Sequence, residues 1–461
     1  MLSRSRRFAR PAAIIFAVTL TGARSADNSP VLTDVIGTTT ADVVDYGYCD
    51  GEQDRPMPNS LVSIEGGASG YSDLEGAFTL PHEGSQPVGV STRLQGRWVD
   101  VTNLLGPDPV LTGVAVPGEP IELHWSDASA SDGGRSAYFH TNRIHDIVKY
   151  YDPSWTAPDY VMPVMVNAEF TCGAHWNGTG IQLGRAGFGC ANIAELGDVI
   201  YHEYAHAITQ WIYGGSPEDV GPGNADVAVV FVTGDPIIGE GFFEGDCQQG
   251  LRDVRNTLQY PDDYIPGDPF HNGQIIAGFW WDAREALIAS YGEEEGGEIA
   301  WRVWHMSRRN YQPMSMPDQV FYAFVEDDDD GDLSNGTPHY DELCLAAQNH
   351  GFECPAITSA TPDGGVPQGD RRRISCAPNP MVSSTTIAYR VTGEAASTAI
   401  RIFDLTGRPV RTLKQTHKNP GQHTIDWDGA DGNGRRLPAG IYYLELQHGA
   451  RRASGRVILL K

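Results

Sequence analysis

The chain has 461 residues, of which 59 are acidic and 33 basic, so its formal net charge is −26 at pH 7. A charge of this size and sign argues against nucleic acid as a partner, because the phosphate backbone repels it. The length allows two or three domains, and no segment beyond the N-terminus approaches the ~20 apolar residues of a membrane-spanning helix.

The first 25 residues have the organisation of a secretory signal peptide. A basic start that contains Arg4, Arg6 and Arg7 is followed by an apolar run over residues 12–20 and by the small residues Ala23 and Ser25. This order of basic, apolar and small-residue segments is typical of exported chains. We therefore expect a secreted or cell-surface protein.

Seven cysteines in an exported chain predict disulfide bonds, with one thiol left over. Cys172–Cys190 and Cys344–Cys354 are the expected pairs, because their members lie close together in the sequence. The sequence leaves the remaining connectivity open.

Residues 26–130 are expected to form a β-rich N-terminal domain. They are rich in Gly and Pro, and apolar residues alternate with polar ones without a helical period. The runs 61–67 and 71–80 resemble the hairpin of carboxypeptidase-regulatory-like modules, which implies a β-sandwich. Its role as a prodomain, a substrate-presenting module or a structural cap stays open, and the structural role is preferred.

Residues 131–356 contain the run His202–His206 (HEYAH), which predicts a zinc site and its base. Side chains four apart share one face of a helix, so both imidazoles can bind one metal ion while Glu203 lies beside it. Zn²⁺ lowers the pKa of a bound water to about 7, and a neighbouring carboxylate can accept the proton of that water. The flanking residues predict a helix that begins near Glu195 and ends before Gly214. The alternative is an ordinary amphipathic helix with two partly buried histidines.

The third ligand depends on the class of zinc site. The metzincin class is excluded, because its Gly and His positions are held here by Thr209 and Ile212. The gluzincin class takes a Glu from a following helix, and the run GEGFFE is expected to form that helix. We expect Glu240 as the ligand and Glu244 as a hydrogen-bond partner of a ligand histidine. The reverse assignment and Asp226 as the ligand stay open.

The zinc helix, the GEGFFE run and the segments 137–146 and 270–278 resemble the fungalysin branch of the thermolysin-like metallopeptidases. The resemblance implies an α+β zincin domain with endopeptidase activity on protein or peptide substrates. It also implies that His271 donates a hydrogen bond to the oxyanion. A surface histidine in a loop is the alternative for this residue.

Asn167 and Ala168 resemble the edge strand on which this family binds extended peptide. Such a strand can bind substrate through main-chain hydrogen bonds. A second copy of the pattern at 173–178 leaves the register open. The family's transition-state tyrosine has three candidates, among which the sequence does not choose: Tyr213, Tyr260 and Tyr264.

Residues 327–335 are an acidic loop with alternating carboxylates around a glycine. Ca²⁺ needs several oxygen ligands on a sharply folded backbone, so calcium binding is one interpretation. A solvated acidic turn is the other, since the Glu that completes an EF-hand loop is missing. His339, which follows, is read as a loop histidine.

A polar linker is expected over 357–374, followed by a C-terminal domain over 375–461. Its segments 387–391, 399–404 and 440–446 alternate as strands between turns. They resemble the immunoglobulin-like domain of flagellar hook-capping proteins and the sorting domain of type IX secretion. The resemblance implies an antiparallel β-sandwich, and the second comparison adds the export machinery as a partner.

The sequence thus predicts a multidomain fold with an N-terminal β-sandwich-like region, an α+β thermolysin-like zincin domain and a C-terminal immunoglobulin-like β-sandwich. The expected function is that of a secreted, monomeric zinc metallopeptidase with Glu203 as general base. The alternative is a non-catalytic extracellular binding or adhesion protein with a vestigial zincin domain.

Overall fold

The computed structural model describes residues 33–45, 50–217, 219–247, 250–357, 374–377, 381–391, 396–403, 408–418, 421–432, 434–438, 440–448 and 451–459. The expected signal peptide at 1–25 lies outside these residues, as does nearly all of the expected linker at 357–374. Within the described ranges, no helix is both long and apolar enough to cross a membrane.

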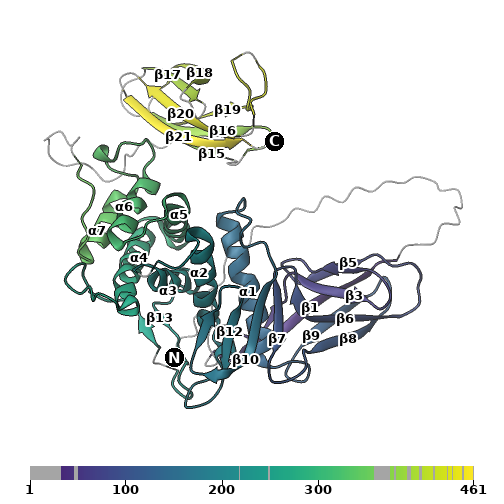
Figure 1. Ribbon diagram of the computed structural model, residues 1–461. Helices are drawn as coiled ribbons and strands as arrows, with labels where there is room; N and C mark the ends of the chain where they lie inside the picture. The colour runs from purple at the N-terminus through teal and green to yellow at the C-terminus, as the bar shows by residue number, and fades with distance from the viewer. Residues whose placement is uncertain are drawn as a thin grey trace, which may run out of the picture.

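Two β-sheets begin the fold (Figure 1). A four-stranded sheet has the order β2-β1-β5, with β9 also paired to β1, and an eight-stranded sheet has the order β11-β12-β10-β7-β6-β3-β4, with β8 paired to β6. Their facing side chains, such as Phe78 and Val62, form a shared buried cluster, as alternation of apolar residues requires. The strands are β1 (Val35–Val44), β2 (Glu52–Pro56), β3 (Ser60–Ile64), β4 (Ser69–Tyr71), β5 (Ala77–Leu80), β6 (Val88–Gly96), β7 (Val99–Asn103), β8 (Val110–Ala115), β9 (Pro120–Trp125), β10 (Met162–Thr171), β11 (Ala174–Trp176) and β12 (Ile181–Arg185).

The domain boundary expected at residue 130 does not separate two sheets. Strand β7 pairs in parallel with β10, from Val99 opposite Met162 to Asn103 opposite Val166. Trp125 from the N-terminal region also belongs to the same hydrophobic core as Ile200. The N-terminal strands and the helical part therefore form one folded body, and the prediction of a separate domain over 26–130 is wrong.

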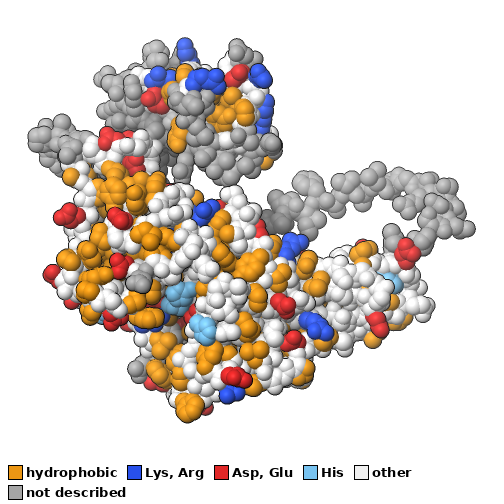
Figure 2. Space-filling model, in the orientation of Figure 1, with side chains coloured by type: hydrophobic (Ala, Val, Ile, Leu, Met, Phe, Trp, Pro, Cys, Tyr) orange, Lys and Arg blue, Asp and Glu red, His pale blue; other side chains and the backbone are white. Residues whose placement is uncertain are grey.

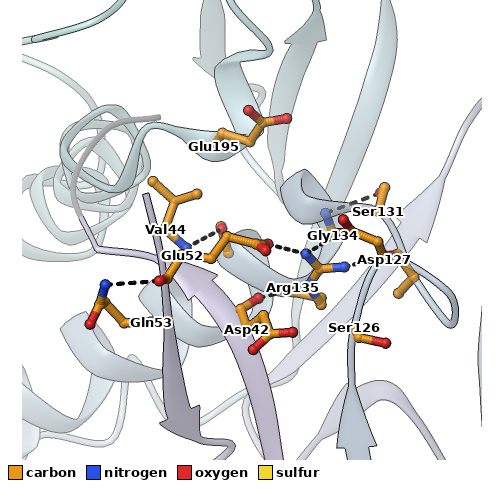
Figure 3. A network of polar contacts seen from close by, with 12 residues as sticks. Asp42, Val44, Glu52, Gln53, Ser126, Asp127, Ser131, Gly134, Arg135 and Glu195 are labelled. Carbon is orange, nitrogen blue, oxygen red and sulfur yellow. Dashed lines mark hydrogen bonds and ion pairs between the residues drawn. The ribbon is translucent and has the colours of Figure 1, made fainter. Parts of the chain in front are cut away.

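Arg135 joins the first helix to the N-terminal sheet (Figure 3). Its fully buried guanidinium donates to the carbonyl oxygen of Asp42 at 2.7 Å and to the carboxylate of Asp127 at 2.7 Å, and it also pairs with Glu52. A buried cation of this kind is costly unless every donor is matched, so these contacts hold the helix in one position on the sheet.

Helices cover the sheet on one side and form the second half of this body (Figure 1). The helix predicted around the zinc motif runs from Gly197 to Tyr213 and ends at Gly214, which takes the left-handed conformation of a C-cap. The helices are α1 (Asp132–Tyr151), α2 (Gly197–Tyr213), α3 (Gly221–Thr233), α4 (Pro269–Tyr291), α5 (Glu293–Tyr311), α6 (Met316–Asp327) and α7 (Tyr340–Asn349). Short elements lie between them: η2 (Ile193–Glu195), β13 (Ile237–Ile238), β14 (Arg252–Asp253) and η3 (Leu333–Asn335).

The C-terminal part is an antiparallel β-sandwich, as predicted. One sheet has the order β15-β16-β19 and the other β18-β17-β20-β21. Trp427, Ile402 and Leu444 are buried between them. The strands are β15 (Ile374–Ala377), β16 (Thr385–Val391), β17 (Ala396–Phe403), β18 (Pro409–Lys418), β19 (Gly421–Trp427), β20 (Gly440–His448) and β21 (Arg451–Leu459).

Both expected disulfide bonds are present, Cys172–Cys190 and Cys344–Cys354. Cys376 is a free thiol, and Cys247 is disulfide-bonded. The pairing predicted from sequence proximity is therefore confirmed.

Candidate metal centre

His202 and His206 point toward the same place on one face of α2. Their Nε2 atoms lie 3.1 Å apart. Two nitrogens bound to one tetrahedral zinc at ~2.0–2.1 Å would be about 3.3 Å apart, so the pair fits this metal without rearrangement. Burial, followed by the neighbouring His202, lowers the pKa of His206 to about 3, so its imidazole is neutral, as a ligand must be.

The other side of His202 is fixed by helix α3. The Nδ1 atom of His202 lies 2.8 Å from Oδ1 of Asp226 and 3.5 Å from Nη2 of Arg252. The closer partner is an acceptor, so Nδ1 carries the proton and Nε2 keeps its lone pair. Burial acts to raise the pKa of Asp226, but Arg252 and His202 together hold it below its ordinary value.

Glu203 is positioned against the end strand of the eight-stranded sheet. Its Oε2 atom accepts a hydrogen bond of 2.6 Å from the backbone N–H of Trp176 in β11. The indole N–H of Trp176 donates in turn to Gln210 of α2 at 2.6 Å. Burial raises the pKa of Glu203, which makes its carboxylate a stronger proton acceptor.

Asp198, one turn before His202, anchors the loop that follows β13. Its carboxylate accepts hydrogen bonds from the backbone N–H groups of Gly239 and Val199. Burial raises the pKa of Asp198 to about 7. Asp198 therefore ties the start of α2 to a backbone segment 41 residues further along the chain.

The helix predicted for the GEGFFE run is wrong. Residues 239–244 form turns after β13, and Gly239 and Gly241 have positive φ angles of 75° and 78°. Glu240 is partly exposed, and burial together with the charges of Asp235 and Asp50 raises its pKa, whereas Glu244 is exposed. Neither carboxylate contacts the histidine pair, and Asp226 takes the role that was predicted for Glu244.

No third ligand joins the histidines in the part of the chain that the structure describes. Within those residues, no carboxylate, thiolate or further imidazole has a ligand atom within 4.8 Å of both histidine nitrogens. The prediction that Glu240 completes the site is therefore not met by the structure. The residues present supply two ligands for zinc, one fewer than the three protein ligands of a catalytic zinc site.

His271 is directed away from the predicted role. Its Nε2 atom lies 3.0 Å from the carbonyl oxygen of Asp263 in the preceding loop, and its backbone N–H donates to Asp268. The hydrogen bonds of His202, Glu203 and His206 do not include His271. The prediction that it serves the oxyanion is not supported by this geometry.

The edge strand is β11, not the strand that holds Asn167 and Ala168. These two residues lie in β10, an inner strand whose pairing with β7 ends at Val166 and whose other side pairs with β12, where Ala168 is opposite Gly184. Strand β11 is the end of the sheet, and it pairs on one side only, with β12. The second copy of the sequence pattern, at 173–178, is therefore the one with a free strand edge beside Glu203.

The histidine pair lies at the margin of the buried core, because His202 and Glu203 are 8% and 6% exposed whereas His206 is partly exposed. Figure 2 shows histidine side chains at the surface of this part of the molecule. His175 of β11 is exposed and His206 is partly exposed. Arg252 and the Trp176 N–H, which sequence reasoning did not identify, reach this site from β14 and β11.

The acidic loop after α6 brings three carboxylates together. Ligand oxygens of Asp328, Asp329 and Asp330 lie within 4.8 Å of one another. Asp327 is separate from them, because it is buried and accepts hydrogen bonds from the Thr337 hydroxyl at 2.6 Å and from the backbone N–H of His339 at 2.8 Å. His339 is thus part of the structural support of the loop.

Comparison with known proteins identifies the C-terminal part. Residues 381–451 match the family model of the FlgD Ig-like domain. The chain therefore has a C-terminal Ig-like domain. No curated protein matches the sequence.

Among solved structures, FlgD from P. aeruginosa is 19% identical, with 16% of this chain and 60% of that chain covered and a TM-score of 0.15. FlgD from Xanthomonas campestris is 25% identical, with 17% and 58% covered and a TM-score of 0.15. PorU from Porphyromonas gingivalis is 22% identical, with 21% and 10% covered and a TM-score of 0.18. The chain thus spans less than two thirds of the length of each of these proteins.

Proposed function

We propose that the chain is an exported zinc-dependent peptide hydrolase, in which His202 and His206 bind the metal and Glu203 is the general base. The observation that carries this proposal is the convergence of the two Nε2 atoms at 3.1 Å, with a carboxylate bonded to the far side of His202. A carboxylate behind a ligand histidine is a typical feature of zinc sites in proteins.

Zinc, when bound, would lower the pKa of a water molecule toward neutrality and polarise a carbonyl oxygen. Glu203 accepts the proton of the attacking water at Oε1, because Oε2 is held by the Trp176 N–H at 2.6 Å. The same carboxylate then gives the proton to the leaving amine. Asp226 keeps the proton of His202 on Nδ1 throughout, which leaves Nε2 as a ligand atom.

Strand β11 supports a peptide as the substrate. Its free edge can hydrogen-bond an extended chain next to Glu203, as in other proteins that bind peptides by adding a strand. A peptide paired with β11 would lie next to Trp176, whose backbone N–H donates to the carboxylate of Glu203.

We place the protein outside the cell or on its surface. The FlgD Ig-like domain and the signal-peptide pattern of residues 1–25 support this location. We further propose that the C-terminal domain directs export by type IX secretion, and that Asp328, Asp329 and Asp330 bind Ca²⁺ through their clustered oxygens.

A second function, peptide binding without hydrolysis, is favoured by one observation. The described residues supply two ligands to the metal, whereas catalytic zinc sites use three. In that case β11 and the two flanking sandwiches would serve as binding surfaces of an extracellular protein.

Hydrolysis of casein by the mature protein, with and without a chelator, tests the proposal. Glu203→Gln keeps the shape of the side chain but removes the base, and a loss of about 10²-fold or more is expected. Glu244→Gln, an exposed change on a neighbouring loop, is the matched control and should keep full activity. Chelator-sensitive cleavage that Glu203→Gln abolishes supports the hydrolase, whereas binding of peptide without any cleavage supports the second function.

A further inference from the structure

Helix α3 is the element that faces the histidine pair from the other side. It packs on α2, and only seven residues separate the end of α2 at Tyr213 from the start of α3 at Gly221, as in a pair of antiparallel helices. Asp226 contacts His202 across this interface. Moving back along α3 from Asp226 therefore corresponds to moving forward along α2 from His202, toward His206.

The residue one turn before Asp226, on the same face of α3, is Pro222. It lies in the first turn of the helix and is partly exposed, whereas Gly221 and Gly223 on either side are buried. The spacing of four places position 222 on the face of α3 that carries Asp226, one turn further toward the level of His206 on α2. Proline offers no atom that can bind a metal ion.

Packing and hydrogen bonds fix the orientation of α3 about its own axis. No other residue in its first turns can therefore take the position of Pro222 on this face of the helix. A Cβ on Gly223 would lie 2.5 Å from the carbonyl oxygen of Gly273, which shows how closely α4 packs there. Asn224 is buried on the opposite face, where its Oδ1 accepts from the Trp304 indole at 2.8 Å and from Gln319 at 2.7 Å. A turn of the helix that brought Asn224 to the histidines would break both hydrogen bonds.

The carboxylates near the pair are also engaged elsewhere. Asp198 holds the backbone N–H of Gly239, Asp226 holds Arg252 through two hydrogen bonds, and Glu203 holds the N–H of Trp176. Both oxygens of Asp198 and of Asp226 accept hydrogen bonds, so either residue would have to give one up to bind the metal, whereas the remaining oxygen of Glu203 serves as the proposed base.

We infer that this protein holds its metal with His202 and His206 alone, and that Pro222 occupies the position from which a third, carboxylate ligand would reach the metal. The inference rests on the proposed metal binding at the histidine pair. Its consequence is a weakly held, exchangeable zinc ion, so that the metal-loaded fraction follows the concentration of free zinc outside the cell. Structural or catalytic sites with a full set of ligands stay loaded under the same conditions.

Zinc affinity of the purified protein, measured by competition with a chromophoric chelator, tests the inference. Pro222→Glu adds a carboxylate in the first turn of α3, where the helix dipole favours an acidic residue. Zinc binding should tighten at least about tenfold, the change that one added interaction of ~1.4 kcal/mol produces. Pro222→Gln is the matched control, because glutamine has nearly the same size as glutamate but carries no charge. The zinc affinity of this variant should stay close to that of the wild type.

A second variant keeps the test independent of how well Pro222→Glu folds. Glu240→Gln should leave zinc affinity unchanged, because its carboxylate lies outside the pair. A loss of tenfold or more in Glu240→Gln, or no gain in a folded Pro222→Glu, would overturn the inference while leaving the proposed metal site standing. Failure of both the wild type and folded Pro222→Glu to bind zinc would overturn the inference and the proposed function together.

Discussion

Replacement of Asp226 by Asn is expected to lower the free energy of unfolding of the metal-free protein by about 3 kcal/mol. The Asp226 carboxylate, whose side chain is 3% exposed, accepts from Arg252 at 2.8 and 2.7 Å and from His202 at 2.8 Å. Breaking a buried ion pair by removing one charge costs about 3–5 kcal/mol. The Arg252 side chain keeps 25% of its surface exposed, so water compensates part of the loss, and the lower limit applies.

Urea unfolding followed by tryptophan fluorescence measures this change. Glu285→Gln is the control, because Glu285 also pairs with an arginine but is 48% exposed, and it should change the unfolding free energy by less than about 0.5 kcal/mol. In a double-mutant cycle, Asp226→Asn and Arg252→Met should couple by about 1 kcal/mol or more. A loss below 1 kcal/mol in Asp226→Asn, or strict additivity in the cycle, would refute the ion-pair reasoning.

Three further predictions concern the folded body as a whole. A chain that starts at residue 131 should give no cooperative unfolding transition in calorimetry, because it lacks β7, the strand that pairs with β10. A sharp transition would show that the helical part folds alone. Burial lowers the pKa of His140 to about 3, against 6.5 in the unfolded chain, so the stability that its neutral form contributes is present above pH 6.5 and is lost as the pH falls toward 3. His140→Gln should reduce the slope of the unfolding free energy against pH in this range by up to ~1.4 kcal/mol per pH unit. An unchanged slope would exclude His140 as its source. Replacing both Cys344 and Cys354 by Ala opens a loop with a sequence separation of 10 and should cost about 2–3 kcal/mol in chemical denaturation; equal midpoints would contradict this estimate.

The part of the site that the sequence could predict is the part held by local structure. The spacing of His202 and His206 places them on one face of a helix, and Gly214 ends that helix, so both features follow from neighbouring residues. The disulfide pairs followed from proximity in the sequence for the same reason.

The rest of the site depends on contacts between distant residues. Asp226 and Arg252 are 26 positions apart and meet only because α3 and β14 are brought together by the fold. The GEGFFE run looked helical, since its two acidic residues are four apart. The run forms turns instead, because the Gly239 N–H donates to Asp198 and because Gly239 and Gly241 have positive φ angles.

The domain boundary at 130 was misjudged for a similar reason. The composition changes there, from alternating apolar residues to a helix, but the pairing of strands does not end. Strand β7 pairs in parallel with β10, which follows α1 in the sequence, because a crossover connection can join parallel strands. A change in local pattern therefore marks the start of a helix and not the start of a new domain.

X-ray absorption at the zinc edge of the loaded protein tests the metal centre most directly. We predict one zinc per chain with two histidine nitrogens at ~2.0–2.1 Å and oxygen donors in the remaining positions. The signal of the imidazoles should disappear in His202→Ala and in His206→Ala. A protein that takes up no zinc, or a zinc environment that stays the same in both variants, would contradict the account.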